Sequence, residues 1–198
     1  MTRKEREKEL RREAILGAAR KVFARDGYFN ATMSQIADVS EFGMGTIYKY
    51  FPNKQGLFSE VINEGVETYN TGLKESLTGK KIWHDRLIAF IEYNLKWVEK
   101  QPDLQRLIME IFYFPIPDIT PQIIKRLREV YKENNEVLKG ILSQSVETNK
   151  NIDIDLMSLM IMGTLNSIAN DWLMGILKKV PTEYISGIMG VVAGGKDA

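Results

Sequence analysis

The sequence predicts an all-α protein, and three observations support this. Apolar residues recur at intervals of three and four along most of the 198 residues, which is the period of a helix. These segments begin at residues that cap helix N-termini and end near glycine or proline. No stretch shows the alternation with a period of two that marks a strand. We expect an N-terminal three-helix domain over residues 1–53 and a helical domain over residues 54–198, with about nine helices in all.

The composition is that of an ordinary globular protein, with 44% hydrophobic and 27% charged residues. There is no cysteine, which excludes disulfides and thiolate metal sites and fits a reducing cytoplasm. Residues 2–13 lack the apolar segment of a signal peptide, and no segment reaches about 18 consecutive apolar residues. We therefore expect a cytoplasmic protein that does not span a membrane.

The formal net charge of +1 hides an asymmetry along the chain. Residues 1–54 hold 11 Lys and Arg against 7 Asp and Glu, whereas the remaining residues hold 16 against 19. The positive charge therefore lies at the end that carries the motif described below.

The first expected helix covers residues 7–25, and Gly27 ends it. Its apolar residues at helical spacing are Ile15, Ala18, Ala19, Val22 and Phe23. Residues 2–13 mix both signs of charge and have two interpretations. They are either a solvated helix start, or a segment whose basic side chains approach DNA phosphates. The basic candidates are Arg3, Lys4, Arg6 and Arg11.

Residues 32–54 predict two short helices around a tight corner. Thr32 can cap the first helix, and Gln35 can reach back to the cap amide, which completes a capping box. This helix is expected over residues 33–39. The small and polar members of residues 40–43 suit a turn, in which Gly43 can cap the next helix. The second helix, over residues 44–50, points Ile47 and Phe51 inward. Its outward residues are Met44, Gly45, Thr46, Tyr48, Lys49 and Tyr50.

A short helix with a small, hydroxylic, basic and aromatic outer face is poorly suited to building a core and well suited to entering a DNA groove. The two helices are therefore interpreted as a helix-turn-helix. Pro52 cannot continue the second helix, and Asn53 can cap the next one, expected over residues 54–77. The N–H groups of its first turn, its dipole and the Lys54 ammonium predict a phosphate site.

A set of residues in and after this motif carries a family resemblance. They are Thr32, Ile36, Ala37, Gly45, Thr46, Ile47, Tyr48, Tyr50, Phe51, Asn53, Lys54, Leu57 and Phe58. At these positions the first third of the chain resembles the TetR/AcrR family of bacterial transcriptional repressors. The resemblance implies phosphate contacts from Thr32, Thr46, Tyr48 and Lys54. It implies base-edge contacts from Met44, Gly45, Lys49 and Tyr50, and Gly43 completes the candidate DNA-binding residues.

Two residues at the corner depart from the family pattern. The family usually has Gly where this chain has Glu41, and Ser where it has Gly43. Glu41 is therefore expected to adopt a less comfortable backbone angle, and its carboxylate would be repelled by phosphate.

Every expected element beyond residue 77 is also a helix. The ranges are 82–100, 103–113, 121–148, 154–178 and 182–192. Thr120 is expected to cap the helix that Pro121 starts, and Pro102 and Pro181 mark two further boundaries. A loop is expected at residues 114–119, a break at 149–151 and a loose tail at 194–198.

An aromatic stripe at helical spacing runs along residues 83–97. Core packing is the default interpretation, and a ligand cavity is the alternative, because aromatic and Met side chains line adaptable apolar pockets. The resemblance favours the cavity, since family members typically hold a small inducer between these helices. The candidate lining residues are Trp83, Leu87, Phe90, Tyr93, Asn94, Trp97, Met109, Phe112, Tyr113, Asn166 and Asn170.

Residues 156–177 are apolar on almost all sides, so this helix is expected to be buried on several of them. In the family the final two long helices pair with their twofold mates, and the last two helices here resemble that pair. The candidate dimer contacts are Leu156, Met160, Gly163, Ser167, Asp171, Tyr184, Ile188 and Val192. Gly163 and two later glycines can permit a close approach of two subunits, or they can serve packing within one.

The sequence shows no catalytic constellation. His84 is the only histidine, there is no cysteine, and no Gly-rich phosphate loop is present. We expect neither an enzyme nor a bound cofactor or metal. The prediction is a homodimeric repressor that binds a palindromic operator DNA and is released by a small, largely apolar effector. The alternatives are a non-specific DNA-organising protein, or an activator or co-repressed regulator that responds to its ligand with the opposite sign.

Overall fold

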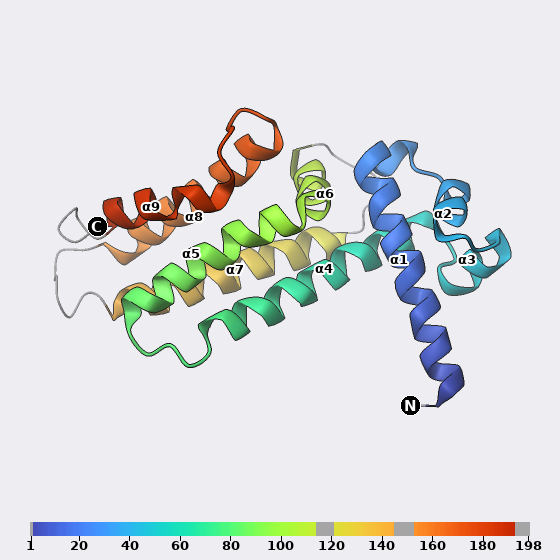
Figure 1. The fold of residues 1–198 in the computed structure, drawn as a ribbon, viewed down its shortest axis with the longest axis horizontal. Helices are drawn as coiled ribbons and strands as arrows, with labels where there is room; N and C mark the ends of the chain where they lie inside the picture. The colour runs from blue at the N-terminus through green and yellow to red at the C-terminus, as the bar shows by residue number, and fades with distance from the viewer. Residues whose placement is uncertain (1, 114–120, 145–152, 193–198) are drawn as a thin grey trace. The chain divides into compact units, whose positions relative to one another are not determined.

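The computed structural model describes residues 2–113, 121–144 and 153–192. Within these residues it contains nine α-helices, one 3₁₀ helix and no strand, which confirms the all-α prediction (Figure 1). The expected loop at 114–119, the Thr120 cap, the break at 149–151 and the tail at 194–198 lie outside the described residues. None of the described helices is both long enough and apolar enough to cross a membrane.

The chain divides into two compact units. The first comprises residues Met1–Glu67 and Asp103–Lys125, and the second comprises Thr68–Pro102 and Arg126–Ala198. The predicted division at residues 53 and 54 was drawn from the helix-turn-helix motif and remains a prediction.

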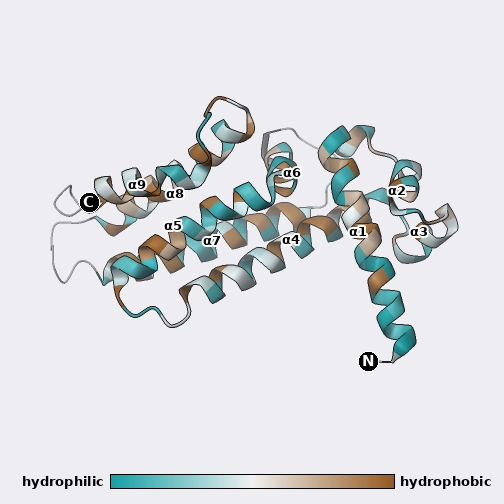
Figure 2. Ribbon diagram, in the orientation of Figure 1, coloured by the Kyte–Doolittle hydropathy of each residue, from teal (hydrophilic) through white to brown (hydrophobic). Residues whose placement is uncertain are grey.

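The first unit begins with α1 (Arg3–Asn30), which starts four residues earlier than predicted. Thr2 and Glu5 form a capping box, so the charged segment is helical from its first residue. Figure 2 shows how hydrophilic this N-terminal part of α1 is. At Gly27 the backbone leaves the helical conformation with φ 73° and ψ 168°, and only one further turn follows before Ala31.

Three more helices follow at the positions that the sequence predicts. They are α2 (Met33–Ser40), α3 (Met44–Tyr50) and α4 (Lys54–Leu77). Their shared core contains aromatic rings in edge-to-face contact, with centroids 5.0 Å apart for Phe23 and Phe58 and 4.9 Å apart for Tyr28 and Phe58. Ion pairs from Arg12 to Glu60 and from Arg20 to Glu64 also join α1 to α4.

Helix α6 (Pro102–Tyr113) belongs almost entirely to the first unit. Its residues Leu104, Leu107 and Ile111 are buried. Leu104 lies so close to Gly65 of α4 that a Cβ there would overlap its side chain.

The second unit contains the last turns of α4 and five further elements. These are α5 (Trp83–Lys100), most of α7 (Pro121–Ser143), α8 (Ile154–Leu173), the 3₁₀ helix η1 (Pro181–Tyr184) and α9 (Ile185–Val192). Their fully buried core includes Leu87, Phe90, Ile91, Leu138 and Ile141. The sequence predicted a single helix over 182–192, and the structure instead has a 3₁₀ turn followed by a short α-helix.

Helix α8 ends at Leu173, five residues before the predicted end. Gly175 has φ 75°, and the amides of Gly175 and Ile176 donate to the carbonyls of Trp172 and Asp171. This is a Schellman motif, in which a glycine in the left-handed conformation satisfies the last carbonyls of a helix. Gly175 is thus a termination signal that the sequence prediction overlooked.

Helix α8 also differs from its predicted burial on several sides. Within the chain one face is buried, and it carries Ile161, Met162, Leu165 and Ile168. The opposite face exposes Leu156, Leu159 and Met160 to at least half their full accessible area.

Candidate functional site

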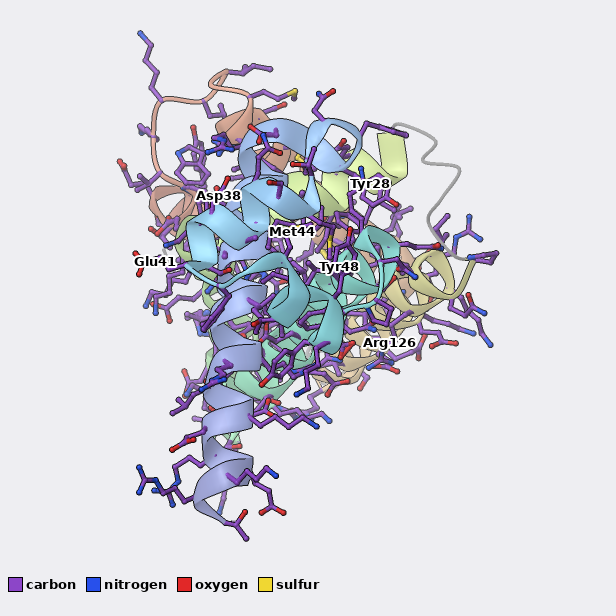
Figure 3. The ribbon with its side chains drawn as sticks, turned by 90° about the vertical axis from the view of Figure 1, so that its right-hand side faces the viewer. Tyr28, Asp38, Glu41, Met44, Tyr48 and Arg126 are labelled. Atoms are coloured by element: carbon purple, nitrogen blue, oxygen red, sulfur yellow. The ribbon has the colours of Figure 1, made fainter. Side chains whose placement is uncertain are left out.

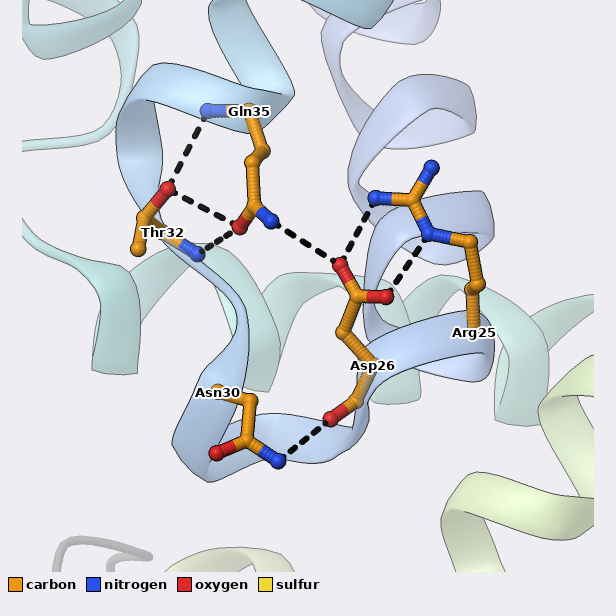
Figure 4. Close-up of polar contacts among 5 residues, drawn as sticks. All are labelled: Arg25, Asp26, Asn30, Thr32 and Gln35. Carbon is orange, nitrogen blue, oxygen red and sulfur yellow. Dashed lines mark hydrogen bonds and ion pairs between the residues drawn. The ribbon is translucent and has the colours of Figure 1, made fainter.

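The start of the helix-turn-helix is fixed by a polar network that joins α1 to α2 (Figure 4). The Thr32 hydroxyl accepts from the Gln35 amide at 3.2 Å, while Gln35 Oε1 accepts from the Thr32 amide and hydroxyl at 2.8 and 2.9 Å. This confirms the predicted capping box. Gln35 Nε2 also donates to Asp26 Oδ2 at 3.2 Å.

Arg25 completes the network. Its guanidinium donates two hydrogen bonds of 2.7 Å to the Asp26 carboxylate. This pairing lowers the pKa of Asp26 and raises that of Arg25. The Thr32 hydroxyl already donates to Gln35, so a phosphate contact through its proton would have to replace that bond. That contact remains a prediction.

At the corner between α2 and α3, Glu41 has the strained backbone angle that was expected because the family usually has Gly at this position. Glu41 has φ 58° and ψ 25°, and it is the one non-glycine residue with positive φ among those the structure describes. The amides of Glu41 and Phe42 donate to carbonyls in the last turn of α2. Glu41 therefore occupies a helix-ending position that glycine fills with less strain.

Helix α3 presents the predicted outer face. Ile47 is fully buried and Phe51 nearly so, whereas Gly43, Met44, Gly45, Tyr48 and Lys49 are exposed and Thr46 and Tyr50 are half-buried. Glu41, Met44 and Tyr48 are labelled in Figure 3. A Cβ on Gly43 or Gly45 would meet no atom within 4 Å, so the start of α3 is open at both positions. An open face with aromatic, thioether and ammonium groups is suited to contacts with base edges and phosphates.

Lys54, at the start of α4, has contacts that differ from its predicted role. Its Nζ donates to the backbone carbonyls of Tyr28, Phe29 and Ala31 at 2.9, 3.1 and 3.1 Å. It also lies 4.6 Å from the centre of the Tyr28 ring. An ammonium group has three donors, so a direct phosphate contact would cost at least one of these bonds. The predicted phosphate contact of the Lys54 ammonium would therefore have to displace a hydrogen bond that the structure shows, and it remains a prediction.

The predicted cap of α4 is confirmed. Asn53 Oδ1 accepts from the Gly56 amide at 2.7 Å, and the Asn53 carbonyl accepts from Leu57. The N-terminus of α4 is thus ordered through Asn53, independently of the Lys54 side chain.

In the second unit, part of the aromatic stripe meets polar side chains from two other helices. Tyr93 and Trp97 of α5 pack on Tyr69 of α4, with ring centroids 5.5 and 5.4 Å from that of Tyr69. The Tyr69 hydroxyl donates to Asn94 Oδ1 at 2.7 Å and accepts from Asn134 Nδ2 at 3.0 Å. The structure thus brings three candidates, Tyr93, Asn94 and Trp97, into one cluster.

Tyr69 and Asn134 belong to the cluster and were missed by the sequence analysis. Nothing in the sequence around either residue indicated a role in this cluster, because each of them contacts residues of other helices. Desolvation, followed by the influence of Tyr93, raises the pKa of Tyr69. Burial and then the charge of Glu75 raise the pKa of Tyr93 to about 12. The cluster is therefore neutral in the physiological pH range.

The remaining pocket candidates lie elsewhere. Leu87 and Phe90 are fully buried in the core of the second unit, and Trp83 packs against that core, which agrees with the default interpretation. Asn166 is exposed, and α8 places it on the same face as Met160 and Gly163, so it does not join the cluster. Asn170 continues that face one turn further along and is half-buried.

Three pocket candidates lie in α6, which belongs to the first unit. Met109 is half-buried. Phe112 and Tyr113 lie in the last turn of that helix, and their side chains are outside the described part of the chain. Their role as pocket residues remains a prediction.

The dimer candidates separate into two groups. Leu156, Met160, Gly163 and Ser167 are exposed on one face of α8, and Asp171 at its end is half-buried. Ile188 of α9 is instead buried in the core of its own unit, with Tyr184 and Val192 packed against that core. For Ile188, burial within the subunit contradicts the expectation of a side chain available to a partner.

Comparison with known proteins assigns the region around the helix-turn-helix to a family. Residues 15–61 match the family model described as bacterial regulatory proteins, tetR family. The fatty acid metabolism regulator protein of Bacillus subtilis is 28% identical over 81% of this chain and 82% of its own length. The probable acrEF/envCD operon repressor of Escherichia coli K12 is 25% identical over 83% of this chain and 77% of its own.

The fold agrees with these relatives. The crystal structure of the transcriptional regulator FadR from Bacillus subtilis in complex with stearoyl-CoA superposes with a TM-score of 0.73. It is 22% identical and covers 92% of this chain and 98% of that chain. The helix-turn-helix geometry, the family model and the relatives agree: residues 15–61 form the DNA-binding region typical of the tetR family of bacterial regulatory proteins, and the chain is a DNA-binding transcriptional regulator rather than an enzyme.

Proposed function

We propose that this regulator is a repressor that binds a palindromic operator as a homodimer and releases it when a small effector binds. The observation that carries the proposal is the outer face of α3. Met44, Tyr48 and Lys49 are exposed there, while Ile47 of the same helix is fully buried. The core holds the helix, and the exposed side chains are left to contact DNA.

Each chemical group on this face suits a contact in the major groove. The Lys49 ammonium can donate to guanine O6 and N7, and the Met44 side chain can contact a thymine methyl group. The Thr46 and Tyr48 hydroxyls can bind phosphate, which positions the helix without reading sequence. In the cytoplasm, where we place this protein, these contacts would repress transcription by occupying a promoter. The Escherichia coli relative is a probable operon repressor, which supports this sign of regulation.

Dimerisation is supported by the exposed face of α8. Leu156, Met160, Gly163 and Ser167 follow one another at spacings of four, three and four residues, which is the spacing of a seam between packed helices. Small residues at Gly163 and Ser167 allow two helices to approach closely. An exposed apolar stripe of this kind marks an interaction surface, and a second copy of the chain would cover it with the same stripe.

The effector is proposed to bind in the helical second unit. The cluster of Tyr69, Tyr93, Asn94 and Trp97 combines aromatic surface with neutral polar groups, which suits a largely apolar ligand with a polar end. The related FadR was crystallised with stearoyl-CoA, which makes acyl-CoA compounds the first class to test. Helix α4 carries both Lys54 and Tyr69, so it is the proposed link between effector and DNA.

The DNA-binding part is tested by selecting duplexes from a random pool. We expect enrichment of a palindrome whose half-sites are about 34–36 Å apart, or a multiple of that distance. Lys49→Ala is expected to weaken binding to the selected duplex by roughly 1–3 kcal/mol. A non-specific DNA-organising protein would enrich no palindrome and would bind random duplexes equally well at the same salt concentration.

The effector is tested by adding stearoyl-CoA to the complex with the selected duplex. We expect operator affinity to fall about 5- to 150-fold, which corresponds to a coupling of roughly 1–3 kcal/mol. Tighter binding would identify a co-repressed regulator. A ligand that binds at saturation and leaves affinity unchanged would refute the proposed switch.

The dimer is tested by sedimentation equilibrium of Leu159→Glu. This substitution puts a charge on the exposed face of α8 and is expected to yield monomers. Ile82→Glu is the matched control, because Ile82 and Leu159 are both 62% exposed and Ile82 lies outside the α8 face. Dimers that persist in Leu159→Glu would exclude this face as the interface.

A further inference from the structure

The connector between α1 and α2 is held by a side chain from α4. Gly27 breaks α1, and the carbonyls of Tyr28, Phe29 and Ala31 converge on one point beyond it. Lys54 Nζ occupies that point and donates to all three at 2.9–3.1 Å. Its charge also lies over the Tyr28 ring, where a cation is attracted to the aromatic face.

These bonds place Lys54 next to the residue that starts the helix-turn-helix. Ala31, whose carbonyl accepts from Lys54, directly precedes Thr32, the N-cap of α2. Thr32 is bonded to Gln35, and Gln35 is tied to Asp26 on the other side of the connector. The beginning of α2 is therefore fixed from α1 through Asp26 and from α4 through Lys54.

We propose that Lys54 is a positioning residue for DNA recognition: its ammonium sets the start of α2, and thereby the placement of α3, without itself contacting phosphate. This proposal rests on the DNA-binding function proposed above. Three charge-assisted hydrogen bonds to backbone carbonyls satisfy the ammonium fully. A phosphate could bind the ammonium only by replacing at least one of the hydrogen bonds that hold the connector in place.

The salt dependence of DNA affinity separates a positioning role from a phosphate contact. A lysine that neutralises a phosphate releases counterions, so its loss makes the slope of log K against log salt shallower by about 0.9. A lysine that acts through the backbone releases none. Its loss lowers affinity at every salt concentration by the same factor.

Two variants of Lys54 test this on the selected duplex between about 50 and 200 mM salt. Lys54→Met keeps the apolar stem and removes the charge, whereas Lys54→Arg keeps the charge and cannot direct three donors from one nitrogen. We expect both to lose affinity by about 10-fold or more, with the slope of the wild type. Lys49→Met removes one exposed charge from α3 and is the matched control. Because Lys49 is proposed to carry its charge into the groove between the phosphates, where it releases counterions, we expect a shallower slope for this variant.

A direct phosphate contact by Lys54 would give a different result in both variants. If Lys54 contacted phosphate, Lys54→Met would flatten the slope by about 0.9, and Lys54→Arg would bind like the wild type. The unfolding free energy of each variant is measured in parallel, and affinities are compared under conditions in which every variant is folded. If the Lys54 variants bound the duplex as tightly as the wild type once all of them were folded, the positioning role would be refuted.

A second measurement needs no DNA. Amide hydrogen exchange at Ala31, Gln35 and Ile36 is expected to accelerate in both Lys54 variants and to remain unchanged in Lys49→Met. Unchanged exchange in the Lys54 variants would refute the proposal even if DNA binding fell. If the wild type bound no duplex, the proposed function would fail. The exchange measurement would still show whether Lys54 holds the start of α2.

A third measurement uses the unmodified protein, in case the variants do not fold. The ¹⁵N resonance of the Lys54 ammonium is expected to persist, because its protons are held by carbonyls, and to be unchanged when the duplex is added. A shift of this resonance on DNA binding, comparable to that of Lys49, would identify a direct contact and overturn the proposal.

Discussion

The hydroxyl of Tyr93 donates a hydrogen bond of 2.9 Å to the backbone carbonyl of Tyr69, and this bond joins α5 to α4. It forms beside Gly72, where a Cβ would overlap the Tyr93 hydroxyl and ring. Gly72 therefore provides the space in which the aromatic cluster of the second unit closes.

Gly72→Ala is expected to lower the unfolding free energy by about 1–3 kcal/mol, because the new methyl group displaces Tyr93 from its acceptor. This loss should exceed the gain of about 1 kcal/mol that alanine brings to a helix. Urea unfolding followed by circular dichroism measures the difference. Gly140→Ala is the matched control, since Gly140 is also helical and a Cβ there meets nothing within 4 Å. Equal stabilisation by the two substitutions would contradict the overlap.

The raised pKa of Tyr93 predicts a loss of stability at alkaline pH. A tyrosine in the unfolded chain ionises near pH 10, whereas burial keeps the folded Tyr93 neutral until about pH 12. The folded state therefore holds a proton that the unfolded state loses, and this contribution to stability is complete below about pH 10. It declines as the pH rises from about 10 to 12.

Tyr93→Phe is expected to make the fall in unfolding free energy between about pH 10 and 12 less steep. Unfolding in urea at several pH values measures this slope. Tyr131→Phe, at an exposed position, serves as the control and should keep the wild-type slope. A Tyr93→Phe profile parallel to that of the wild type would show that another group causes the alkaline loss.

Much of the first unit could be predicted because its signals are local. Thr32 and Gln35 form a capping box within one turn, and Asn53 caps α4 through an amide three residues away. The burial of Ile47 follows from helical periodicity alone. Glu41 was singled out because it stands where the family usually has glycine, and its positive φ confirms the expectation.

The predictions that the structure did not reproduce depend on contacts between distant residues. Lys54 was assigned to phosphate because nothing near it in sequence shows that residues 28–31 turn their carbonyls toward it after the Gly27 break. Asn166 was grouped with the pocket because the sequence does not show which side of α8 faces the core when nearly every side of the helix is apolar. In the structure, Ile161 and Leu165 pack in the core, and this packing determines which side of α8 is exposed.

Gly27→Ala tests the break in α1. The angles φ 73° and ψ 168° lie in a region that only glycine occupies readily, and a Cβ would also approach Glu110 Oε1 to 3.1 Å. We expect a loss of about 1–3 kcal/mol in unfolding free energy. Gly17→Ala in the same helix meets nothing within 4 Å and should be neutral or stabilising by up to about 1 kcal/mol. A neutral Gly27→Ala would show that the connector can be rebuilt without this angle.

The corner residue Glu41 combines two effects that substitution can separate. Its left-handed backbone costs roughly 1–2 kcal/mol for a residue with a side chain, and its exposed carboxylate lies next to a helix that we propose enters DNA. Glu41→Gly removes both the strain and the charge, whereas Glu41→Gln removes only the charge. We expect Glu41→Gly to raise the unfolding free energy by about 1 kcal/mol and Glu41→Gln to leave it nearly unchanged.

Both substitutions are expected to tighten binding to the selected duplex, because each removes a charge that phosphate repels. The gain should shrink as salt is added, since screening weakens the repulsion that the wild type experiences. Equal gains for the two variants would assign the effect to charge, and a larger gain for Glu41→Gly would assign the excess to the geometry of the turn. Unchanged or weaker binding in Glu41→Gly would reject both, and would mean that the left-handed corner with its carboxylate contributes to how α3 is presented.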